Sequence, residues 1–348
     1  MTTQSPHPII LYLSLFLLSA LLTWTFHHPP SPSHPNSSRP PSGIPRLAFA
    51  TFLGPNTNPS AATTDAQSAA LHDTDDGYFL GVRVLTYQLL HSPITASNLS
   101  IPFVVLTTPE VSPRKRERLR ADGATVVTVP RFENGWMRVG DARYGDVMTK
   151  LRLWELVQFD KVCFLDSDTL VTRRLDEVFW DEGTVLRTVK QGKGEEGEPE
   201  PPRHYMFAAN VDTWGYEHAW PPDPEGGYFN VGFFCFRPDR EVFEYYVKMA
   251  ALEGKYSAQF PEQNMLNYVH RKEGRMPWAR LWEGWNVNWP TERDYRNGVG
   301  SFHAKYWDSD PSHDKVLKAI WREQRAEMEG YWRGREGDEG RIGGIHGA

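Results

Sequence analysis

Two aspartates separated by one residue follow an apolar run near the middle of the chain. Asp166 and Asp168 come directly after the run 161–165 (KVCFL), which is expected to form a buried strand. Carboxylates at the end of such a strand are costly unless water solvates them or a cation neutralises them. Carboxylate oxygens suit Mn²⁺ or Mg²⁺, which often complete their coordination with phosphate oxygens. The pattern predicts a divalent metal site beside a phosphorylated ligand. A turn in which the aspartates cap the next helix is the alternative.

The elements expected around this pair alternate between strands and helices. Apolar runs bounded by glycine, proline or polar residues predict strands at 46–53, 103–106, 126–129 and 161–165. Apolar residues at helical spacing predict helices at 78–90, 113–121 and 146–159. This alternation is typical of an α/β fold with a mostly parallel sheet and helices on both faces. Ligands of such sheets bind beyond the carboxyl ends of the strands, where the aspartate pair is expected.

Four segments, in order along the chain, resemble glycosyltransferase family 8, the glycogenin-like enzymes. They are 149–154 (TKLRLW), 163–171 (CFLDSDTLV), 228–234 (YFNVGFF) and 261–267 (PEQNMLN). The resemblance implies a GT-A (Rossmann-like) fold, with a mixed, mostly parallel sheet and flanking helices. It also implies retaining transfer of a hexosyl or N-acetylhexosaminyl group from a UDP-sugar. The acceptor would be a glycan, a glycoprotein or a glycolipid.

The resemblance also implies a metal site with three ligands. Asp166 and Asp168 would bind Mn²⁺, with Mg²⁺ as the alternative, and His303 would be the third ligand. The family places this histidine in the motif H-x-x-G-x-x-K-P-W. Here the segment 302–307 (FHAKYW) is shorter and lacks the glycine, which weakens the match for Lys305 more than for His303.

Further residues are expected to bind the donor because they match family positions. Thr51 and Tyr78 would hold the uridine, with Tyr78 stacked on the base. Lys150 would lie near the donor sugar, Asn210 would contact sugar hydroxyls, and Lys305 would contact the diphosphate.

Four residues are expected around the reacting carbon. Asp212 would contact sugar hydroxyls, and Asn230 and Gln263 would lie at the anomeric face. Glu262 occupies the place of a family aspartate and is the nearest candidate nucleophile. No carboxylate is an evident nucleophile, so we expect front-face attack assisted by the departing phosphate.

The sequence divides into five segments. They are a cytoplasmic tail at 1–8, a signal anchor at 9–26, a Pro/Ser-rich stem at 27–45, the catalytic domain at 46–333 and a flexible tail at 334–348. The anchor is expected because 9–26 is uncharged, mostly apolar and about 27 Å long as a helix. A cleaved signal peptide, whose apolar core is usually shorter, is the alternative.

These features predict a single-pass type II protein of the Golgi or endoplasmic reticulum membrane, with a lumenal catalytic domain. The sequons at Asn36 and Asn98 support this orientation. The absence of Lys or Arg before the apolar run, with Arg39 and Arg46 after it, opposes it.

Composition excludes several classes of protein. A formal net charge of -6 and a pI near 6.1 give no electrostatic footprint for nucleic acid. Two cysteines cannot form a disulfide framework or a four-thiolate zinc site. Cys163 and Cys235 are expected to be buried free thiols, with pairing as the alternative.

Two other functions remain open from the sequence. A non-catalytic UDP-sugar- or glycan-binding relative is compatible with the shortened His303 segment. A haloacid-dehalogenase-type phosphatase also begins with a strand ending in D-x-D, but it requires threonine where Leu170 stands. In addition, Trp278, Trp282, Trp285 and Trp289 recur at helical spacing, which favours packing, with acceptor-sugar stacking as the alternative.

Overall fold

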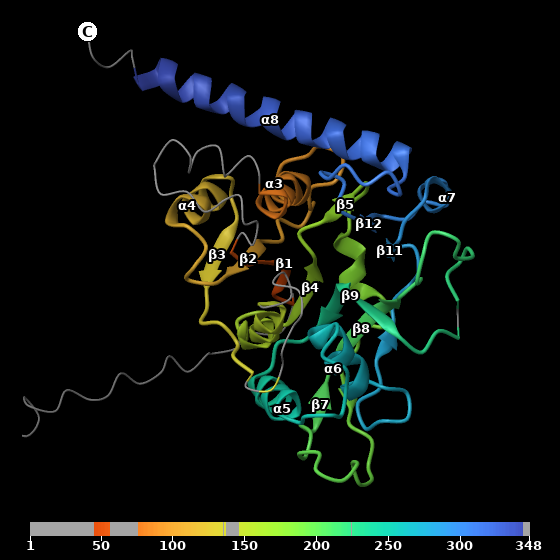
Figure 1. The fold of residues 1–348 in the computed structure, drawn as a ribbon. Helices are drawn as coiled ribbons and strands as arrows, with labels where there is room; N and C mark the ends of the chain where they lie inside the picture. Colours follow the sequence, from red (N-terminus) through yellow and green to blue (C-terminus); the bar gives the residue numbers. More distant parts are fainter. Residues whose placement is uncertain (1–44, 56–75, 135, 137–145, 224, 344–348) are drawn as a thin grey trace, which may run out of the picture. The chain divides into compact units, whose positions relative to one another are not determined.

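The computed structural model describes residues 45–55, 76–134, 136, 146–223 and 225–343, of which 337–343 as backbone alone. The described residues lie in one compact unit, Pro45–Ala348 (Figure 1). The expected segments 1–8, 9–26 and nearly all of 27–45 lie outside the described residues, so they stay predictions. Among the helices that are described, none combines the length and apolarity needed to cross a bilayer.

A seven-stranded sheet forms the centre of this unit. Its strands lie in the order β10-β8-β9-β4-β1-β2-β3. β4, β1, β2 and β3 are mutually parallel and β10 is parallel to β8, whereas β9 is antiparallel to both β4 and β8. The predicted mixed, mostly parallel sheet is therefore confirmed. The strands are β1 (Leu47–Leu53), β2 (Phe103–Thr107), β3 (Thr125–Thr128), β4 (Lys161–Leu165), β8 (Phe207–Val211), β9 (Phe229–Phe236) and β10 (Ala279–Arg280).

Two smaller sheets extend this architecture. β5 (Thr169–Val171), β11 (Asn286–Asn288) and β12 (Ser301–His303) form a three-stranded sheet in the order β11-β12-β5. β6 (Arg187–Thr188) pairs with β7 (His204–Tyr205). Because β5 begins four residues after β4 ends, the intervening turn lies where the large and the three-stranded sheets meet.

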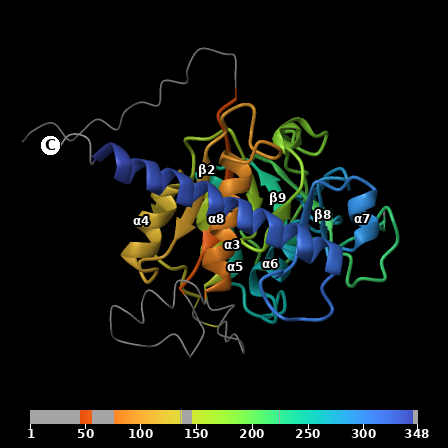
Figure 2. The same ribbon diagram turned by 90° about the horizontal axis from the view of Figure 1, so that it is seen from above.

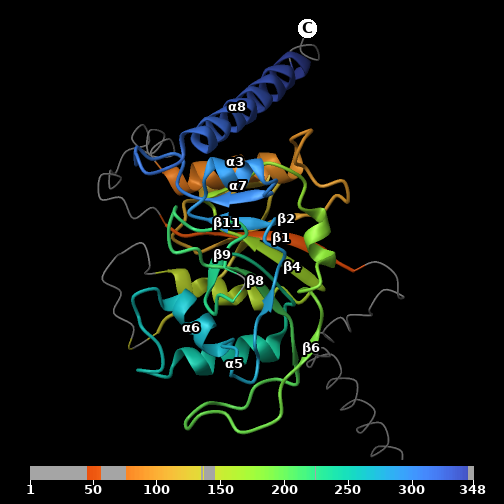
Figure 3. The same cartoon turned by 90° about the vertical axis from the view of Figure 1, so that its right-hand side faces the viewer.

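Helices cover both faces of the central sheet (Figure 3). α3, α4 and η4 pack on one face, and the long helix α8 crosses over α3 (Figure 2). η3, α5 and α6 pack on the other face. The helices are α3 (Gly77–Leu90), α4 (Pro113–Ala121), η3 (Val147–Glu155), η4 (Asp176–Trp180), α5 (Arg240–Ala250), α6 (Pro261–Val269), α7 (Glu292–Arg296) and α8 (Lys315–Gly343). α8 continues into the predicted C-terminal tail, and residues 344–348 lie outside the described part.

The apolar runs became strands because both faces of the sheet are covered. In β1, Leu47, Phe49 and Leu53 pack toward α3, whereas Ala48 and Phe52 pack toward η3. A strand buried on both faces needs apolar residues at consecutive positions, which is the pattern from which it was predicted. The two cysteines face each other across β4 and β9 and are buried free thiols, as expected.

The predicted amphipathic α-helix at 146–159 is wrong in type and extent. The segment forms the 3₁₀ helix η3, which ends at Glu155, and the expected core residue Val157 is 43% exposed. η3 packs against α5 and α6 and buries six of its nine residues, Lys150 among them. η3 is therefore buried on several sides, whereas the spacing of its apolar residues predicted one buried stripe.

Candidate active site

The aspartate pair lies in the turn between β4 and β5. The backbone amide of Asp166 donates to the Gly232 carbonyl of β9 (2.8 Å), and the Asp168 carbonyl accepts from the Ala304 amide, which follows β12 (3.1 Å). Both aspartates are thus held by neighbouring strands at the edge where the two sheets meet. The sequence-based expectation that β4 carries them to its carboxyl end agrees with this position.

His303 completes a three-residue cluster. Its strand β12 is antiparallel to β5, which places His303 opposite Thr169. Nε2 lies 3.0 Å from Asp168 Oδ1 and 3.7 Å from Asp166 Oδ2, and one potential ligand atom from each residue lies within 4.8 Å of the others. Burial would lower the pKa of His303, but the charge of Asp168 outweighs this and raises it. The three residues that the sequence predicted as metal ligands are brought together.

A second contact fixes the orientation of the His303 ring. Nδ1 lies 3.2 Å from Asn230 Oδ1, which also accepts a hydrogen bond from the Gly232 amide (2.7 Å). Because that oxygen can only accept, His303 Nδ1 donates to it, and Nε2 is directed at the carboxylates. A Cβ on Gly232 would lie 2.1 Å from Nδ1, so glycine is required here for the ring to fit.

Two lysines flank the cluster. Lys150 Nζ lies 2.7 Å from Asp166 Oδ1 and 3.1 Å from Glu262 Oε2, and Lys305 Nζ lies 3.3 Å from Asp168 Oδ2. Burial would lower the pKa of Lys150, but Asp166 and Glu262 outweigh this and raise it. Mainly through the charge of Asp168, the pKa of Lys305 is also raised. Both side chains are therefore cationic at neutral pH.

The two buried acids of this group differ in their pKa. Burial would raise the pKa of Asp168, but the charges of His303 and Lys305 hold it well below its usual range. In Glu262, burial prevails over the attraction of Lys150 and raises the pKa to about 7. Asp168 is thus an anion throughout the physiological range, whereas Glu262 titrates near neutrality.

Asp212 is the centre of a separate hydrogen-bond network. Its Oδ1 accepts from the amide of Trp214 (3.0 Å) and from Asn288 Nδ2 (2.8 Å). Its Oδ2 accepts from Asn230 Nδ2 (3.1 Å) and Gln263 Nε2 (3.1 Å). A carboxylate offers about four acceptor sites. The protein itself supplies that many donors here, so Asp212 positions Asn230 and Gln263 rather than presenting free oxygens.

These residues line one cavity of about 380 Å³. Ten of the twelve residues that the sequence predicted for the site contribute to its lining. They are Tyr78, Lys150, Asp166, Asp168, Asp212, Asn230, Glu262, Gln263, His303 and Lys305. The ring centroids of Tyr78 and Trp307 lie 5.2 Å apart. Lys305 Nζ lies 5.9 Å from the centroid of the Tyr78 ring.

Thr51 and Asn210 are not among the lining residues. Thr51 is fully buried in the central strand β1, two residues before it ends. Asn210 is 5% exposed, and its Nδ2 donates to the carbonyl of Trp282 (3.1 Å). Both residues were predicted from their resemblance to family positions. In the structure each side chain is buried within the central sheet and does not line the cavity.

Other lining residues were not predicted from the sequence. Asp146, Trp214, Asn288 and Trp289 line the cavity. The tryptophan spacing gave a partial signal for Trp289, but the helix that it suggested does not form. Trp278 directly precedes the short strand β10, Trp282 and Trp285 lie between β10 and β11, and Trp289 directly follows β11. Trp285 is 5% exposed, whereas Trp282 is 48% and Trp289 is 46% exposed.

The cavity lies beyond the carboxyl ends of parallel strands, and its carboxylates, imidazole and two ammonium groups are the groups that suit a divalent cation beside a phosphorylated ligand. The chain belongs to glycosyl transferase family 8, whose model matches residues 72–305. The α/β sheet described above is the GT-A-like fold expected for this family. Membership of this family rules out the alternative that the chain is a haloacid-dehalogenase-type phosphatase.

The chain is similar to several individual proteins. The uncharacterized protein C4C3.09 of Schizosaccharomyces pombe is 32% identical over 284 residues, covering 73% of this chain and 74% of that protein. Glycogenin-1 of Oryctolagus cuniculus is 27% identical over 198 residues, covering 56% of this chain and 47% of glycogenin-1. The solved apo structure of the bifunctional glycosyltransferase WbbM covers 84% of this chain and 52% of its own, with a TM-score of 0.49 and 18% identity.

Proposed function

We propose that the chain is a retaining glycosyltransferase that moves a hexose or related sugar from a UDP-sugar to a glycan or glycoconjugate acceptor. The observation that carries the proposal is the convergence of Asp166, Asp168 and His303 beside Lys150 and Lys305 in one cavity. Three ligands for a cation next to two fixed ammonium groups suit a diphosphate.

The residues of the cluster fit Mn²⁺. Two carboxylates and an imidazole form a mixed oxygen and nitrogen donor set, and Nε2 of His303 faces the carboxylates because Nδ1 is held by Asn230. Mg²⁺, which prefers oxygen ligands, fits this set less well. A bound Mn²⁺ would neutralise charge that develops on the departing diphosphate.

Lys305 and Lys150 would have different roles in binding the donor. Lys305 is 36% exposed at its side chain and borders the cavity, so its ammonium group would contact the donor diphosphate. Lys150 is buried between Asp166 and Glu262, where it holds both carboxylates in place. At the other end of the donor, the Tyr78 ring at the cavity wall would stack on the uracil base.

Retention of configuration is what the family resemblance implies, and the state of the nearby carboxylates indicates how it would be achieved. Asp212 already accepts four hydrogen bonds, and Glu262 is 3% exposed and paired with Lys150. Neither is placed as a free nucleophile. The reaction would therefore proceed by front-face attack. The bond from the anomeric carbon to the UDP oxygen breaks, the bond to the acceptor oxygen forms on the same face, and the acceptor proton passes to the departing phosphate.

The test measures UDP release by the full-length chain with a panel of UDP-sugars, in Mn²⁺ and in EDTA. The panel contains UDP-glucose, UDP-galactose, UDP-N-acetylglucosamine, UDP-xylose and UDP-glucuronate. We expect release from one donor, lost in EDTA and in Asp168→Asn. Asp310→Asn is the matched control. It makes the same change in another Asp-x-Asp pair, and Asp310 is not among the residues that line the cavity.

A non-catalytic relative is the second candidate, and the same assay separates it. Binding of Mn²⁺ and UDP by the full-length chain, measured by calorimetry, without release from any donor would favour this candidate. Absence of both binding and release would contradict the metal-site assignment.

A Golgi location with an N-terminal anchor is part of the proposal and rests on the sequence of residues 9–26 and the sequons. Asn98 is exposed, so glycosylation there is sterically possible. Sensitivity of the expressed protein to peptide-N-glycosidase, and its loss in Asn36→Gln/Asn98→Gln, would support a lumenal domain. Unglycosylated cytosolic protein would contradict it.

A further inference from the structure

Two exposed tryptophans border the cavity beside the reacting centre. Trp214 is 69% exposed and Trp289 is 46% exposed, although both line the cavity. The ring of Trp214 lies 4.9 Å from that of Tyr228, and the ring of Trp289 meets Tyr216 edge-on at 5.3 Å. Each indole is therefore supported from one side while much of its surface stays open to solvent. Large aromatic surfaces left exposed at a cavity mark a binding site.

The backbone at both tryptophans is held in an unfavourable conformation. Trp214 has φ = 62° and Trp289 has φ = 52°, in the left-handed region that bulky residues rarely adopt. Such strain persists where surrounding contacts enforce it, and it concentrates at functional sites. Two strained, exposed tryptophans beside one cavity are not explained by packing.

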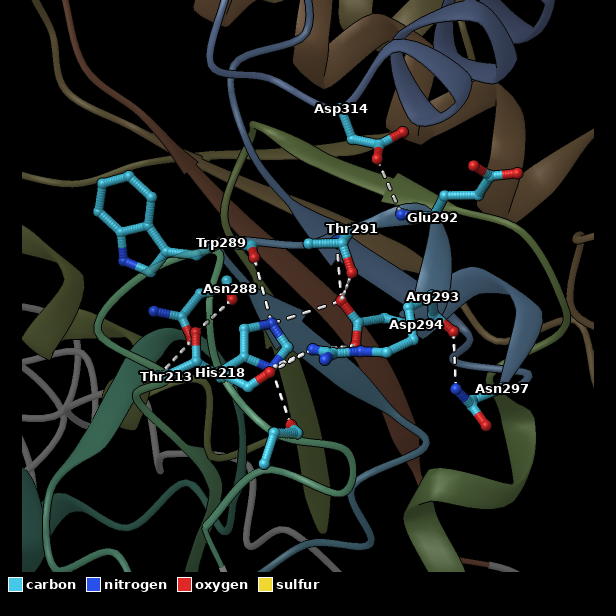
Figure 4. A network of polar contacts seen from close by, with 11 residues as sticks. Thr213, His218, Asn288, Trp289, Thr291, Glu292, Arg293, Asp294, Asn297 and Asp314 are labelled. Atoms are coloured by element: carbon cyan, nitrogen blue, oxygen red, sulfur yellow. Dashed lines mark hydrogen bonds and ion pairs between the residues drawn. The ribbon is translucent and has the colours of Figure 1, made fainter.

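A hydrogen-bond network joins the residues beside the two tryptophans (Figure 4). Thr213 donates from its backbone and side chain to Asn288, with distances of 3.1 Å to Oδ1 and 2.6 Å to the carbonyl. His218 Nε2 lies 3.3 Å from the Trp289 carbonyl and 3.4 Å from Asp294 Oδ2. The loop that carries Trp214 is thereby joined to the segment that carries Trp289.

The same network reaches the residues expected at the anomeric carbon. Asp212 accepts from the Trp214 amide and from Asn288 on one oxygen, and from Asn230 and Gln263 on the other. The position of the tryptophans is thus linked through one carboxylate to that of Asn230 and Gln263. This placement is what an acceptor subsite requires, because the acceptor hydroxyl must meet the anomeric carbon.

The charges near the two tryptophans indicate a neutral acceptor. The basic side chains among the cavity-lining residues are Lys150, Lys305 and His303, and each contacts an acid of the metal cluster or Glu262. Near the tryptophans the lining contributes the carboxylate Asp212 and the amide Asn288. An anionic sugar would find no free cation among these lining residues, whereas a neutral pyranose offers a C–H face to an indole.

We propose that Trp214 and Trp289 form the acceptor subsite and stack on the neutral pyranose ring whose hydroxyl is glycosylated. The inference rests on the proposed function, because an acceptor is needed only if sugar is transferred. Asp212 and Asn288 are positioning residues that fix the two indoles relative to the reacting centre.

The experiment titrates acceptor probes against UDP release by the full-length chain. The probes are the methyl α- and β-pyranosides of glucose, galactose and mannose, tested one at a time with the preferred donor. For the pyranoside that stimulates release, Trp214→Ala and Trp289→Ala should each raise the acceptor KM about tenfold, the size expected for loss of one aromatic stacking contact. The donor KM should change less than about twofold, which a general structural defect would not reproduce.

Trp282→Ala is the matched control. Trp282 is 48% exposed, comparable to Trp289, but it is not among the cavity-lining residues and lies beside Arg173. It should leave the acceptor KM unchanged. Trp214→Tyr, which keeps an aromatic face, should recover most of the acceptor affinity if Trp214→Ala loses it.

The possible failures are distinguishable. If the unsubstituted chain releases UDP but no methyl pyranoside stimulates it, or if Trp214→Ala and Trp289→Ala behave like Trp282→Ala, the acceptor subsite is overturned and the proposed function stands. If no donor is turned over under any condition and no Mn²⁺–UDP binding is found, the proposed function fails, and the subsite fails with it.

Discussion

Two histidines of this chain, His303 and His270, occupy opposite environments. His303 lies between Asp166 and Asp168 at the edge of the sheet, and the charge of Asp168 raises its pKa against the effect of burial. His270 is fully buried among aromatic residues between the central sheet and α5, where burial lowers its pKa to about 3. Its ring stacks on Phe207 with centroids 4.4 Å apart. The pKa of the same side chain is raised in one region and lowered in the other.

The difference lies in the partners of the ring nitrogens. Both nitrogens of His270 are satisfied by neutral groups, the Tyr246 hydroxyl (2.5 Å) and the Met276 carbonyl (2.6 Å). In His303 one nitrogen is satisfied by Asn230, while the other faces two carboxylates that can share a cation. A histidine beside aromatic residues is therefore a candidate ligand only when one nitrogen is directed at anions.

The largest contrast is expected from the same substitution at both positions. His303→Phe removes a metal ligand, so we expect the rate of UDP release to fall about 1,000-fold. This exceeds the 10- to 100-fold loss of activity that is typical when a residue that only orients a metal ligand is replaced. His270→Phe leaves the Tyr246 hydroxyl and the Met276 carbonyl without their partner, so we expect the free energy of unfolding to fall by about 2 kcal/mol. Activity per folded molecule should persist in His270→Phe. Steady-state UDP release and urea unfolding of both variants measure the contrast.

Equal loss of activity in the two variants would contradict the separation of a catalytic from a structural histidine. Equal loss of stability without loss of activity would contradict the role of His303 as a ligand. Mn²⁺ binding measured by calorimetry provides a readout that does not depend on turnover.

The next prediction disturbs His303 without replacing it. Gly232→Ala would place a methyl group 2.1 Å from Nδ1 of His303, so the ring must leave the position in which Nε2 meets Asp168. We expect Mn²⁺ affinity to fall about 10- to 100-fold, as for other residues that orient a ligand. Gly330→Ala is the control, because nothing lies within 4 Å of its added methyl group. Unchanged Mn²⁺ affinity in Gly232→Ala would show that the ring is not held against β9.

The contrast between the histidines was only partly predictable from the sequence. Asp166 and Asp168 were located by physics alone, because they follow an apolar run that had to be a buried strand. His303 was found through its resemblance to a family motif, since β12 and β4 are far apart along the chain. The partners of His270 come from α5 and the segment before β10, and no local pattern indicates them.

The same limit explains the other differences. The strands predicted at 46–53 and 103–106 agree with β1 and β2 within one residue, because local apolarity decides them. The hydrogen bonds from Asn230, Gln263 and Asn288 to Asp212 join segments that are 18 to 76 residues apart, which sequence periodicity cannot reveal. From the sequence, acceptor-sugar stacking was only the alternative for Trp289, and no pattern indicated Trp214, whose place beside the cavity depends on those long-range bonds.

A further effect is expected from pH, and it sharpens the contrast at His270. Its folded-state pKa is about 3, below the usual 6.5 of the unfolded chain, so protons bind preferentially to the unfolded state between these values. The resulting stability is fully present above pH 6.5 and is lost as pH falls toward 3. Between pH 7 and 4.5 the free energy of unfolding should therefore fall by about 2 to 3 kcal/mol more in the unsubstituted chain than in His270→Phe.

Urea unfolding of both proteins at the two pH values measures this difference. Effects of the distant carboxylates, Asp168 included, are common to both proteins and cancel in the comparison, because separate sites contribute additively. Parallel pH profiles would mean that His270 has a similar pKa in both states, and that its aromatic surroundings do not hold it neutral. A steeper profile in the unsubstituted chain would establish that burial, and not sequence context, separates the structural histidine from the one at the carboxylates.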